Sequence, residues 1–250
     1  GMATISTANS NLDGTGTLGT VLTAASNGPL IRTVSVKAQT NTSQGMVRLF
    51  VYDGTNTKLI EEIEVPAVTK SGQDPAFETS ITLNFSLKSG WILKASTEIG
   101  DTFNIIAEGL DWAYYASSVR PDTTQGAPYS HGLAGKISTA NPNLDGTGTI
   151  GTVFIATKNG SNIKSITVKS IATTTPGMVR LFLWDGTNTK LWKEIPVPAV
   201  TPSATDPSFS AVTRFDNDFA IPMFYRIKAS TQNAETFAVT VEGCSWDYPA

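Results

Sequence analysis

The chain has 250 residues, 40% of them hydrophobic, and a formal net charge of −3 at pH 7. That length can supply two ordinary hydrophobic cores, and without clustered lysine and arginine the chain is not expected to bind nucleic acid. No apolar stretch has the length of a membrane span and no signal peptide is seen. We therefore expect no membrane association, and a location in a virion or in the cytoplasm before assembly.

Short strands separated by turn signals account for the first half of the chain. Apolar and polar side chains alternate along most of these segments, which is the period of a β-strand. No window carries a helical stripe, and regular short strands of this kind predict an all-β fold of antiparallel, jelly-roll-like β-sandwiches. The predicted strands are 17–25, 31–37, 47–52, 59–65, 77–87, 91–97 and 102–108.

The centre of this pattern is a predicted β-hairpin at residues 45–59, which read GMVRLFVYDGTNTKL. Asp53 and Gly54 supply the positive φ that tight hairpin turns need. Apolar side chains fall on both faces of the first strand of the hairpin. We expect one face to meet the sandwich core and the other to meet a second domain or a subunit.

The hairpin returns at residues 177–191 as part of an internal duplication. Residues 5–69 match residues 137–201 with 42 of 65 positions identical, and after a two-residue insertion the second copy matches the first again up to Trp246. Each copy has the length of a domain.

The sequence therefore predicts two tandem β-sandwich domains. The first copy is residues 1–115 and the second is residues 137–250. The segment 116–136 between them is rich in Ser, Pro, Gly and Thr, which is typical of a linker.

Three aromatic residues near the hairpins are candidates for ligand binding. Trp184 and Trp192 stand in the second copy where the first copy has Tyr52 and Ile60. If exposed, Tyr52, Trp184 and Trp192 can serve as stacking platforms for a saccharide beside polar groups. The alternative is that these rings pack a domain or subunit interface.

Two loops resemble the beginning of an EF-hand-type calcium loop, because oxygen-bearing side chains stand at alternate positions before a glycine. The bidentate glutamate of that motif is missing, and an Asn- and Asp-rich turn explains the same residues. Calcium is thus a candidate cofactor with a simple turn as the alternative, and no other cofactor is expected. The candidate ligands are Asn9, Asn11 and Asp13 in the first copy and Asn141, Asn143 and Asp145 in the second.

The inventory of reactive side chains argues against catalysis. One histidine, His131, and one cysteine, Cys244, are too few for a structural zinc site, and no nucleophile-elbow motif accompanies His131. Glu108 and Glu242 are equivalent carboxylates in different copies, so they are not expected to share a cleft. The sequence predicts a protein that is not an enzyme.

The segments VRLFVYDGTNTKL, WILKAST and TFNIIAEGLDW, which begin at Val47, Trp91 and Thr102, resemble small tandem β-sandwich proteins of bacterial and prophage genomes that have no assigned activity. Some of those proteins look like structural parts of phage-type particles. The resemblance implies an assembly role in a virion, and its packing and turn motifs carry no catalytic residues.

Our first hypothesis is a non-enzymatic structural protein that acts through subunit interfaces. We expect a homo-oligomer and favour a trimer, since a duplicated domain would then form a pseudo-sixfold ring. The alternative hypothesis is a carbohydrate-binding or adhesin-like module with two similar sites, which gains avidity from its two copies. That alternative requires exposed indoles at Trp184 and Trp192.

Overall fold

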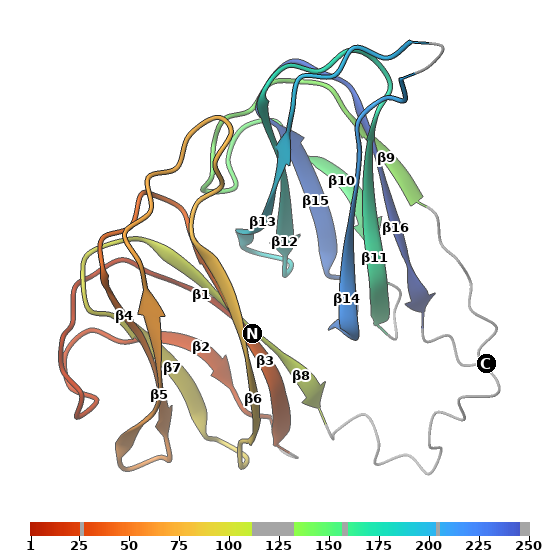
Figure 1. The fold of residues 1–250 in the computed structure, drawn as a ribbon. Coiled ribbons are helices and arrows are strands. Elements are labelled where there is room, and N and C mark those ends of the chain that lie inside the picture. The colour runs from red at the N-terminus through yellow and green to blue at the C-terminus, as the bar shows by residue number, and fades with distance from the viewer. Residues whose placement is uncertain (26–27, 112–132, 157–159, 204–205, 246–250) are drawn as a thin grey trace, which may run out of the picture. The chain divides into compact units, whose positions relative to one another are not determined.

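A computed structural model describes residues 1–25, 28–111, 133–156, 160–203 and 206–245 of the chain. Within these ranges every regular element is a β-strand, and the strands of each sheet pair antiparallel (Figure 1). The same ranges hold no helix with the length and apolarity to cross a membrane. The predicted all-β, antiparallel fold is confirmed.

The first of two compact units is a jelly roll built from β1 to β8. One sheet has the strand order β1-β8-β3-β6 and the other β2-β7-β4-β5, so the chain crosses repeatedly from one sheet to the other. The strands are β1 Met2–Ile5, β2 Gly19–Thr23, β3 Pro29–Ala38, β4 Gly45–Tyr52, β5 Thr57–Val65, β6 Glu78–Ser86, β7 Ile92–Thr97 and β8 Phe103–Asp111.

The second unit has the same arrangement, strand for strand, in β9 to β16. Its sheets have the orders β9-β16-β11-β14 and β10-β15-β12-β13. The strands are β9 Leu133–Ile137, β10 Gly151–Ile155, β11 Ser161–Ser170, β12 Gly177–Trp184, β13 Thr189–Val197, β14 Ser210–Ile221, β15 Arg226–Thr231 and β16 Phe237–Ser245.

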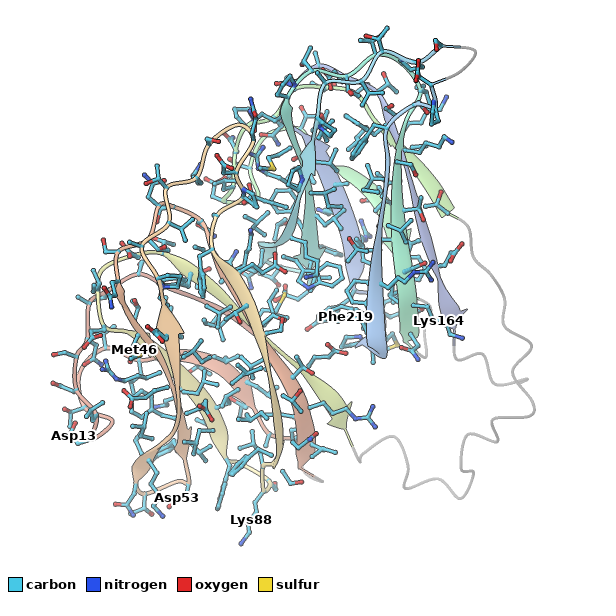
Figure 2. The ribbon with its side chains drawn as sticks, viewed as in Figure 1. Asp13, Met46, Asp53, Lys88, Lys164 and Phe219 are labelled. Atoms are coloured by element: carbon cyan, nitrogen blue, oxygen red, sulfur yellow. The ribbon has the colours of Figure 1, made fainter. Side chains whose placement is uncertain are left out.

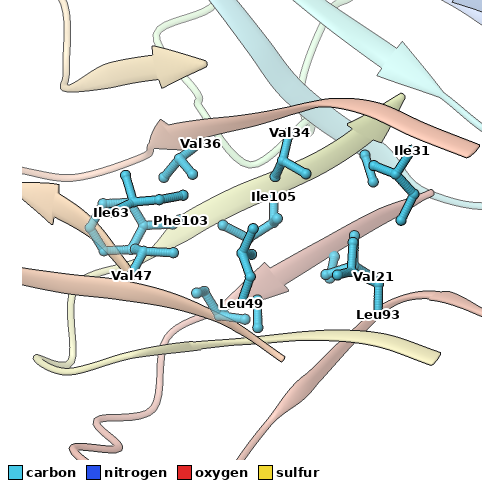
Figure 3. Close-up of a cluster of buried hydrophobic side chains, with 14 of the residues drawn as sticks. Val21, Ile31, Val34, Val36, Val47, Leu49, Ile63, Leu93, Phe103 and Ile105 are labelled. Atoms are coloured by element: carbon cyan, nitrogen blue, oxygen red, sulfur yellow. The ribbon is translucent and has the colours of Figure 1, made fainter. Parts of the chain in front are cut away.

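The core of the first unit lies between its two sheets (Figure 3). Alternate side chains of each strand point to the same face, so the period of two read from the sequence places one apolar set inward. The buried residues labelled in Figure 3 are Val21, Ile31, Val34, Val36, Val47, Leu49, Ile63, Leu93, Phe103 and Ile105.

The predicted hairpin is present as β4 and β5, joined by the turn 53–56. Gly54 has a φ of +97°, as the turn requires. The Asp53 carboxylate accepts hydrogen bonds from the backbone N–H groups of Asn56 (2.7 Å) and Thr55 (2.9 Å). These bonds lower the pKa of the Asp53 carboxyl, and they give the aspartate a structural role.

The outer face of the hairpin is covered by the chain itself. Phe50 points away from the core cluster that holds Leu49, yet it is fully buried. The β1–β2 loop runs along this face: the Asn9 N–H donates to the Thr97 carbonyl (2.8 Å), and a Cβ on Gly14 would lie only 2.5 Å from a Thr57 side-chain carbon. The expectation that this face meets a second domain or a subunit therefore does not hold at its centre.

The two-residue insertion of the second copy lies within β14. In the first unit Thr82 and Phe85 are successive partners of β3, with residues 83–84 between them. In the second unit Arg214 and Phe219 are the matching partners of β11. Residues 215–218 therefore form a larger irregularity in the edge strand, and the two extra residues leave the rest of the register intact.

The predicted linker, 116–136, falls mostly outside the described residues. Its last part is described, and there β9 begins at Leu133 and pairs with β16. The predicted boundary at Lys136 thus falls inside a strand. A short edge strand with a glycine and a lysine in its middle carries little of the apolar alternation by which strands are recognised.

Candidate functional site

Trp192 is a core residue of the second unit. Its side chain is only 2% exposed. The indole stacks on Phe219, with ring centroids 4.4 Å apart, and on Phe215, with centroids 5.1 Å apart and an angle of 8°. The indole thus packs β13 against β14. This burial removes Trp192 as a saccharide platform, because the saccharide-binding hypothesis required an exposed ring.

Tyr52 is half-buried at the end of β4, next to the hairpin turn. Its hydroxyl donates to the Gly54 carbonyl at 2.7 Å. The Lys94 ammonium lies 4.8 Å from the centroid of the ring, within cation–π distance. Tyr52 thus links the turn to β4 by a hydrogen bond, and its ring contacts the Lys94 ammonium.

Trp184 occupies the same place in the second unit and is also half-buried. Its ring carries two cations: the Arg226 guanidinium carbon lies 4.4 Å from the centroid and the Lys228 ammonium 5.1 Å from it. Arg226 is the cross-strand partner of Trp184 on β15. The aromatic pair proposed from the sequence thus differs between the units, with one cation over Tyr52 and two over Trp184.

The neighbouring turn presents an exposed apolar surface formed by Ile155, Met223 and Phe224, which we call the apolar end. Their exposed fractions are 44%, 46% and 59%. The Ala156 N–H donates to the Tyr225 carbonyl at 2.8 Å, which holds the end of β10 beside the β14–β15 turn. Phe224 has a φ of +65°, a left-handed backbone that is uncommon for a bulky side chain.

The first unit has the same turn without the apolar side chains. Thr23, Ser89 and Gly90 stand where the second unit has Ile155, Met223 and Phe224. Figure 2 shows this turn, marked by Lys88, at the same end of the first unit as Asp53. The two units therefore share the backbone of this turn and differ in the side chains that it exposes.

This difference extends over the surface of the second unit. Six large hydrophobic residues are exposed among the described residues, and five of them lie in the second unit. Each of the five replaces Thr, Gln, Ser or Gly in the first copy. The five are Ile155, Ile171, Val212, Met223 and Phe224, and their counterparts are Thr23, Gln39, Ser80, Ser89 and Gly90.

The first candidate calcium loop forms an internally bonded turn. The Asn9 amide group donates to the carbonyls of Thr15 and Thr17, both at 2.9 Å, and its oxygen accepts from the Asn11 N–H at 3.1 Å. Asp13 accepts from both the hydroxyl and the N–H of Thr15. These bonds to Thr15 lower the pKa of the Asp13 carboxyl. Figure 2 labels Asp13 in this loop.

The second candidate calcium loop repeats this pattern. Asn141 donates to the carbonyls of Thr147 and Thr149, both at 2.9 Å, and accepts from the Asn143 N–H at 3.0 Å. Asp145 accepts from the hydroxyl and the N–H of Thr147. In both loops the Oδ1 atoms of the first asparagine and of the aspartate therefore accept hydrogen bonds inside the loop, which favours the turn interpretation of both motifs.

The two glutamates weighed from the sequence lie in different units. Glu108 lies on β8 and Glu242 on β16, in different units, and the Glu242 carboxylate accepts a hydrogen bond from the Ser165 hydroxyl at 2.7 Å. The part of the chain that the structure describes holds no group of three His, Cys, Asp or Glu residues that could bind a metal ion. His131 lies outside that part.

The sequence-based reasoning missed Arg226, Lys228, Met223 and Phe224. A signal for three of them was present in the duplication itself. Arg226 replaces Ile92, Met223 replaces Ser89 and Phe224 replaces Gly90, in a segment (220–227) where every residue differs from its counterpart at 86–93. At some positions one copy has a polar residue where the other has an apolar one, or a neutral residue where the other has a charged one. Such positions indicate where the surfaces of the two copies differ.

No protein-family model and no curated protein sequence matches the chain. Among solved structures, a fucolectin from striped bass (Morone saxatilis) serum is 10% identical with a TM-score of 0.24, over 88% of this chain and 80% of that one. The CBM22-1–CBM22-2 tandem domain of Paenibacillus barcinonensis Xyn10C is 11% identical with a TM-score of 0.27, over 90% and 81%.

A viral capsid protein, the STIV MCP, is 13% identical to the chain with a TM-score of 0.26, over 99% of this chain and 98% of that one. Likenesses at this level are too weak to transfer a function. The residues of the chain itself are what bear on its role.

Proposed function

We propose that this chain is a non-enzymatic structural protein that assembles with copies of itself through the apolar end of its second unit. The observation that carries the proposal is Phe224, which is 59% exposed at a φ of +65° where the first unit has Gly90. An exposed aromatic ring held in an unfavourable backbone conformation is typical of a residue kept for contact with a partner.

The apolar end has the composition of an interface centre. Burial of one large apolar side chain contributes about 1.5–3 kcal/mol when it is complete, and interface cores are enriched in aromatic residues and methionine. Ile155, Met223 and Phe224 supply an aromatic ring, a methionine and a branched aliphatic chain on one surface. In the first unit the same surface is polar, so it would remain in solvent.

A closed ring is the assembly that fits a chain with an apolar end on one of its two units. If only the second unit contributes an apolar end, each chain brings one such surface, and cyclic symmetry can bury every copy of it. A trimer of a duplicated chain would show six similar domains in a ring, which is the form that we favour for a phage-type particle component.

The test is the molar mass in solution, measured by light scattering on a sizing column. The informative variant is I155T/M223S/F224G, which installs the residues of the first unit on the same backbone. We expect the wild-type chain to elute with a multiple of the protomer mass and the variant to elute as a protomer. A wild-type protomer, or a variant that keeps the larger mass, would refute the proposal.

A matched control uses an exposed apolar residue of the second unit outside the apolar end. Val212 is exposed on β14, and the first unit has Ser80 in its place. V212S should keep the wild-type mass. If V212S dissociates the assembly as well, general surface hydrophobicity and not the apolar end would be responsible.

Saccharide binding is a second candidate in a reduced form, because the burial of Trp192 removes one of the two indoles that it required. Of the two tryptophans considered, only Trp184 still reaches the surface, since Trp192 is buried. On this reading W184A abolishes retention on an immobilised glycan while the unfolding transition of the protein stays cooperative. If W184A is retained on the glycan as the wild type is, saccharide binding through Trp184 is excluded.

A further inference from the structure

Two cations share one aromatic ring on the outer face of the second unit. Arg226 and Lys228 are two residues apart on β15, so their side chains leave the same face of the strand. Arg226 is paired with Trp184 in the sheet register, and Lys228 is paired with Phe182, two residues earlier on β12. Both charges therefore lie over the Trp184 ring, at 4.4 and 5.1 Å from its centroid.

Neither cation has an anionic partner within the described residues. No hydrogen bond or ion pair to another described residue involves the side chain of Arg226 or Lys228, and the Arg226 Nε atom is buried without an acceptor. A buried guanidinium nitrogen normally has an acceptor, because leaving it without one costs free energy. The contrast within the unit is Arg180, whose Nε donates to the Glu194 carboxylate at 3.1 Å.

The carboxylate in the adjacent turn does not serve this purpose. Asp185 directly follows Trp184, but its Oδ1 accepts from the N–H groups of Asn188 (2.7 Å) and Thr187 (2.9 Å). Burial alone would raise the pKa of the Asp185 carboxyl, and these hydrogen bonds outweigh it, so the pKa lies below its ordinary value. The Asp185 carboxylate thus accepts hydrogen bonds within its own turn.

Two like charges held together repel one another, and the chain shows the effect. Burial, and after it the positive charge of Arg226, lower the pKa of the Lys228 ammonium. The electron-rich face of Trp184 offsets part of this cost by cation–π attraction. An anion that accepts from the guanidinium and from the ammonium would offset more of it.

We propose that Trp184, Arg226 and Lys228 form a binding site for an oxyanion group, which is a carboxylate, sulfate or phosphate on a small molecule or saccharide. The planar guanidinium donates to such a group through more than one N–H, and the ammonium adds a second charge-assisted hydrogen bond. The site uses other residues than the apolar end but adjoins it, because Arg226 pairs with Ile155 in the sheet register.

The first unit provides a natural control for this site. It has Lys94 over Tyr52, but Ile92 stands where the second unit has Arg226. With one cation and no guanidinium, the first unit should bind an oxyanion far more weakly. The chain is therefore expected to have one strong site, whereas a duplicated saccharide-binding module would have two similar ones.

The experiment follows the indole N–H resonance of Trp184 by NMR while sulfate, phosphate or glucuronate is added. Sodium chloride at equal ionic strength is the reference, since it reproduces screening without a matching oxyanion. We expect saturable displacement of the Trp184 resonance by at least one of the three anions, beyond any effect of chloride. The anion that binds most tightly identifies the class of ligand.

R226I is the decisive variant, because isoleucine occupies the same position in the first unit. It should weaken the binding of that anion by about tenfold or more, which is the scale of a charge-assisted hydrogen bond. R226Q is the second variant in case isoleucine disturbs the strand, and K94A in the first unit should leave the affinity unchanged. The proposal is overturned if no anion acts beyond chloride, or if folded R226I or R226Q binds as the wild type does.

Discussion

Phe224 has a φ of +65°, and Gly90, the residue at the same place in the first unit, has a φ of +77°. The two turns share a left-handed backbone, which glycine adopts freely and which costs an L side chain roughly 1–2 kcal/mol through the clash of its Cβ atom with the backbone. The second unit thus keeps an aromatic ring at a position where the fold favours glycine.

The strain at Phe224 can be measured with F224G. We expect this variant to raise the free energy of unfolding by about 1 kcal/mol, because it relieves the backbone while the largely exposed ring gives up little packing. Denaturant titration at a concentration where the chain is monomeric gives the value. F224A is the control, since alanine keeps the Cβ clash and should be less stable than F224G. A destabilised F224G would show that packing of the ring outweighs the strain.

Trp192 tests whether the aromatic cluster of the second unit belongs to its core. W192I installs the residue of the first unit, Ile60, between Phe215 and Phe219. We expect a loss of about 2–4 kcal/mol in unfolding free energy, since isoleucine leaves part of the indole volume empty. The substitution I60V in the first unit should lower the unfolding free energy by about 0.5–1.5 kcal/mol. Loss of glycan retention by W192I with unchanged stability would instead point to an exposed ring.

Asn141 tests the turn interpretation of the candidate calcium loops. N141A removes two hydrogen bonds to carbonyl groups and one acceptor for the Asn143 N–H, so we expect a loss of about 1–3 kcal/mol in unfolding free energy. The exposed Asn143 makes one side-chain bond, and N143A should cost less. Calcium should not change the melting temperature of the wild type. A rise that disappears in N141A would restore the calcium hypothesis by linkage.

Much of the fold follows from local patterns, and the two strands that escaped prediction share one property. β1 (Met2–Ile5) and β9 (Leu133–Ile137) are short edge strands that pair on one side only, with β8 and β16. Their residues do not alternate cleanly, so nothing local distinguishes them from a loop. They become strands because a long neighbouring strand offers free backbone groups, which is a tertiary effect.

The candidate site was predictable only in part for a related reason. The pattern around Trp184 indicated an aromatic residue beside a turn, and the ring lies there half-buried. The cations over the ring come from β15, more than forty residues along the chain, and only sheet register brings them to Trp184. The cover on the outer face of the hairpin also comes from a distant loop, so the two-faced apolar pattern of β4 looked like an interface.

The paired arginines beneath these loops provide a last comparison between the units. Arg180 pairs with Glu194, and both side chains are buried, at 4% and 2% exposure. In the first unit Arg48 pairs with Glu62, whose side chain is 42% exposed, and also with Glu98 at 3.1 Å. A buried charge that loses its partner is far more costly than an exposed one.

The truncation E194A should therefore cost about 3–5 kcal/mol in unfolding free energy, whereas E62A should cost about 1 kcal/mol or less. In the second unit Gln232 stands where the first has Glu98 and accepts from Arg180 at 3.0 Å without bringing a charge. Adding Q232E to E194A returns a carboxylate to Arg180, so it should recover part of the lost stability. Equal costs for E194A and E62A, or no recovery with Q232E, would mean that the arginine is stabilised by packing and not by its carboxylates.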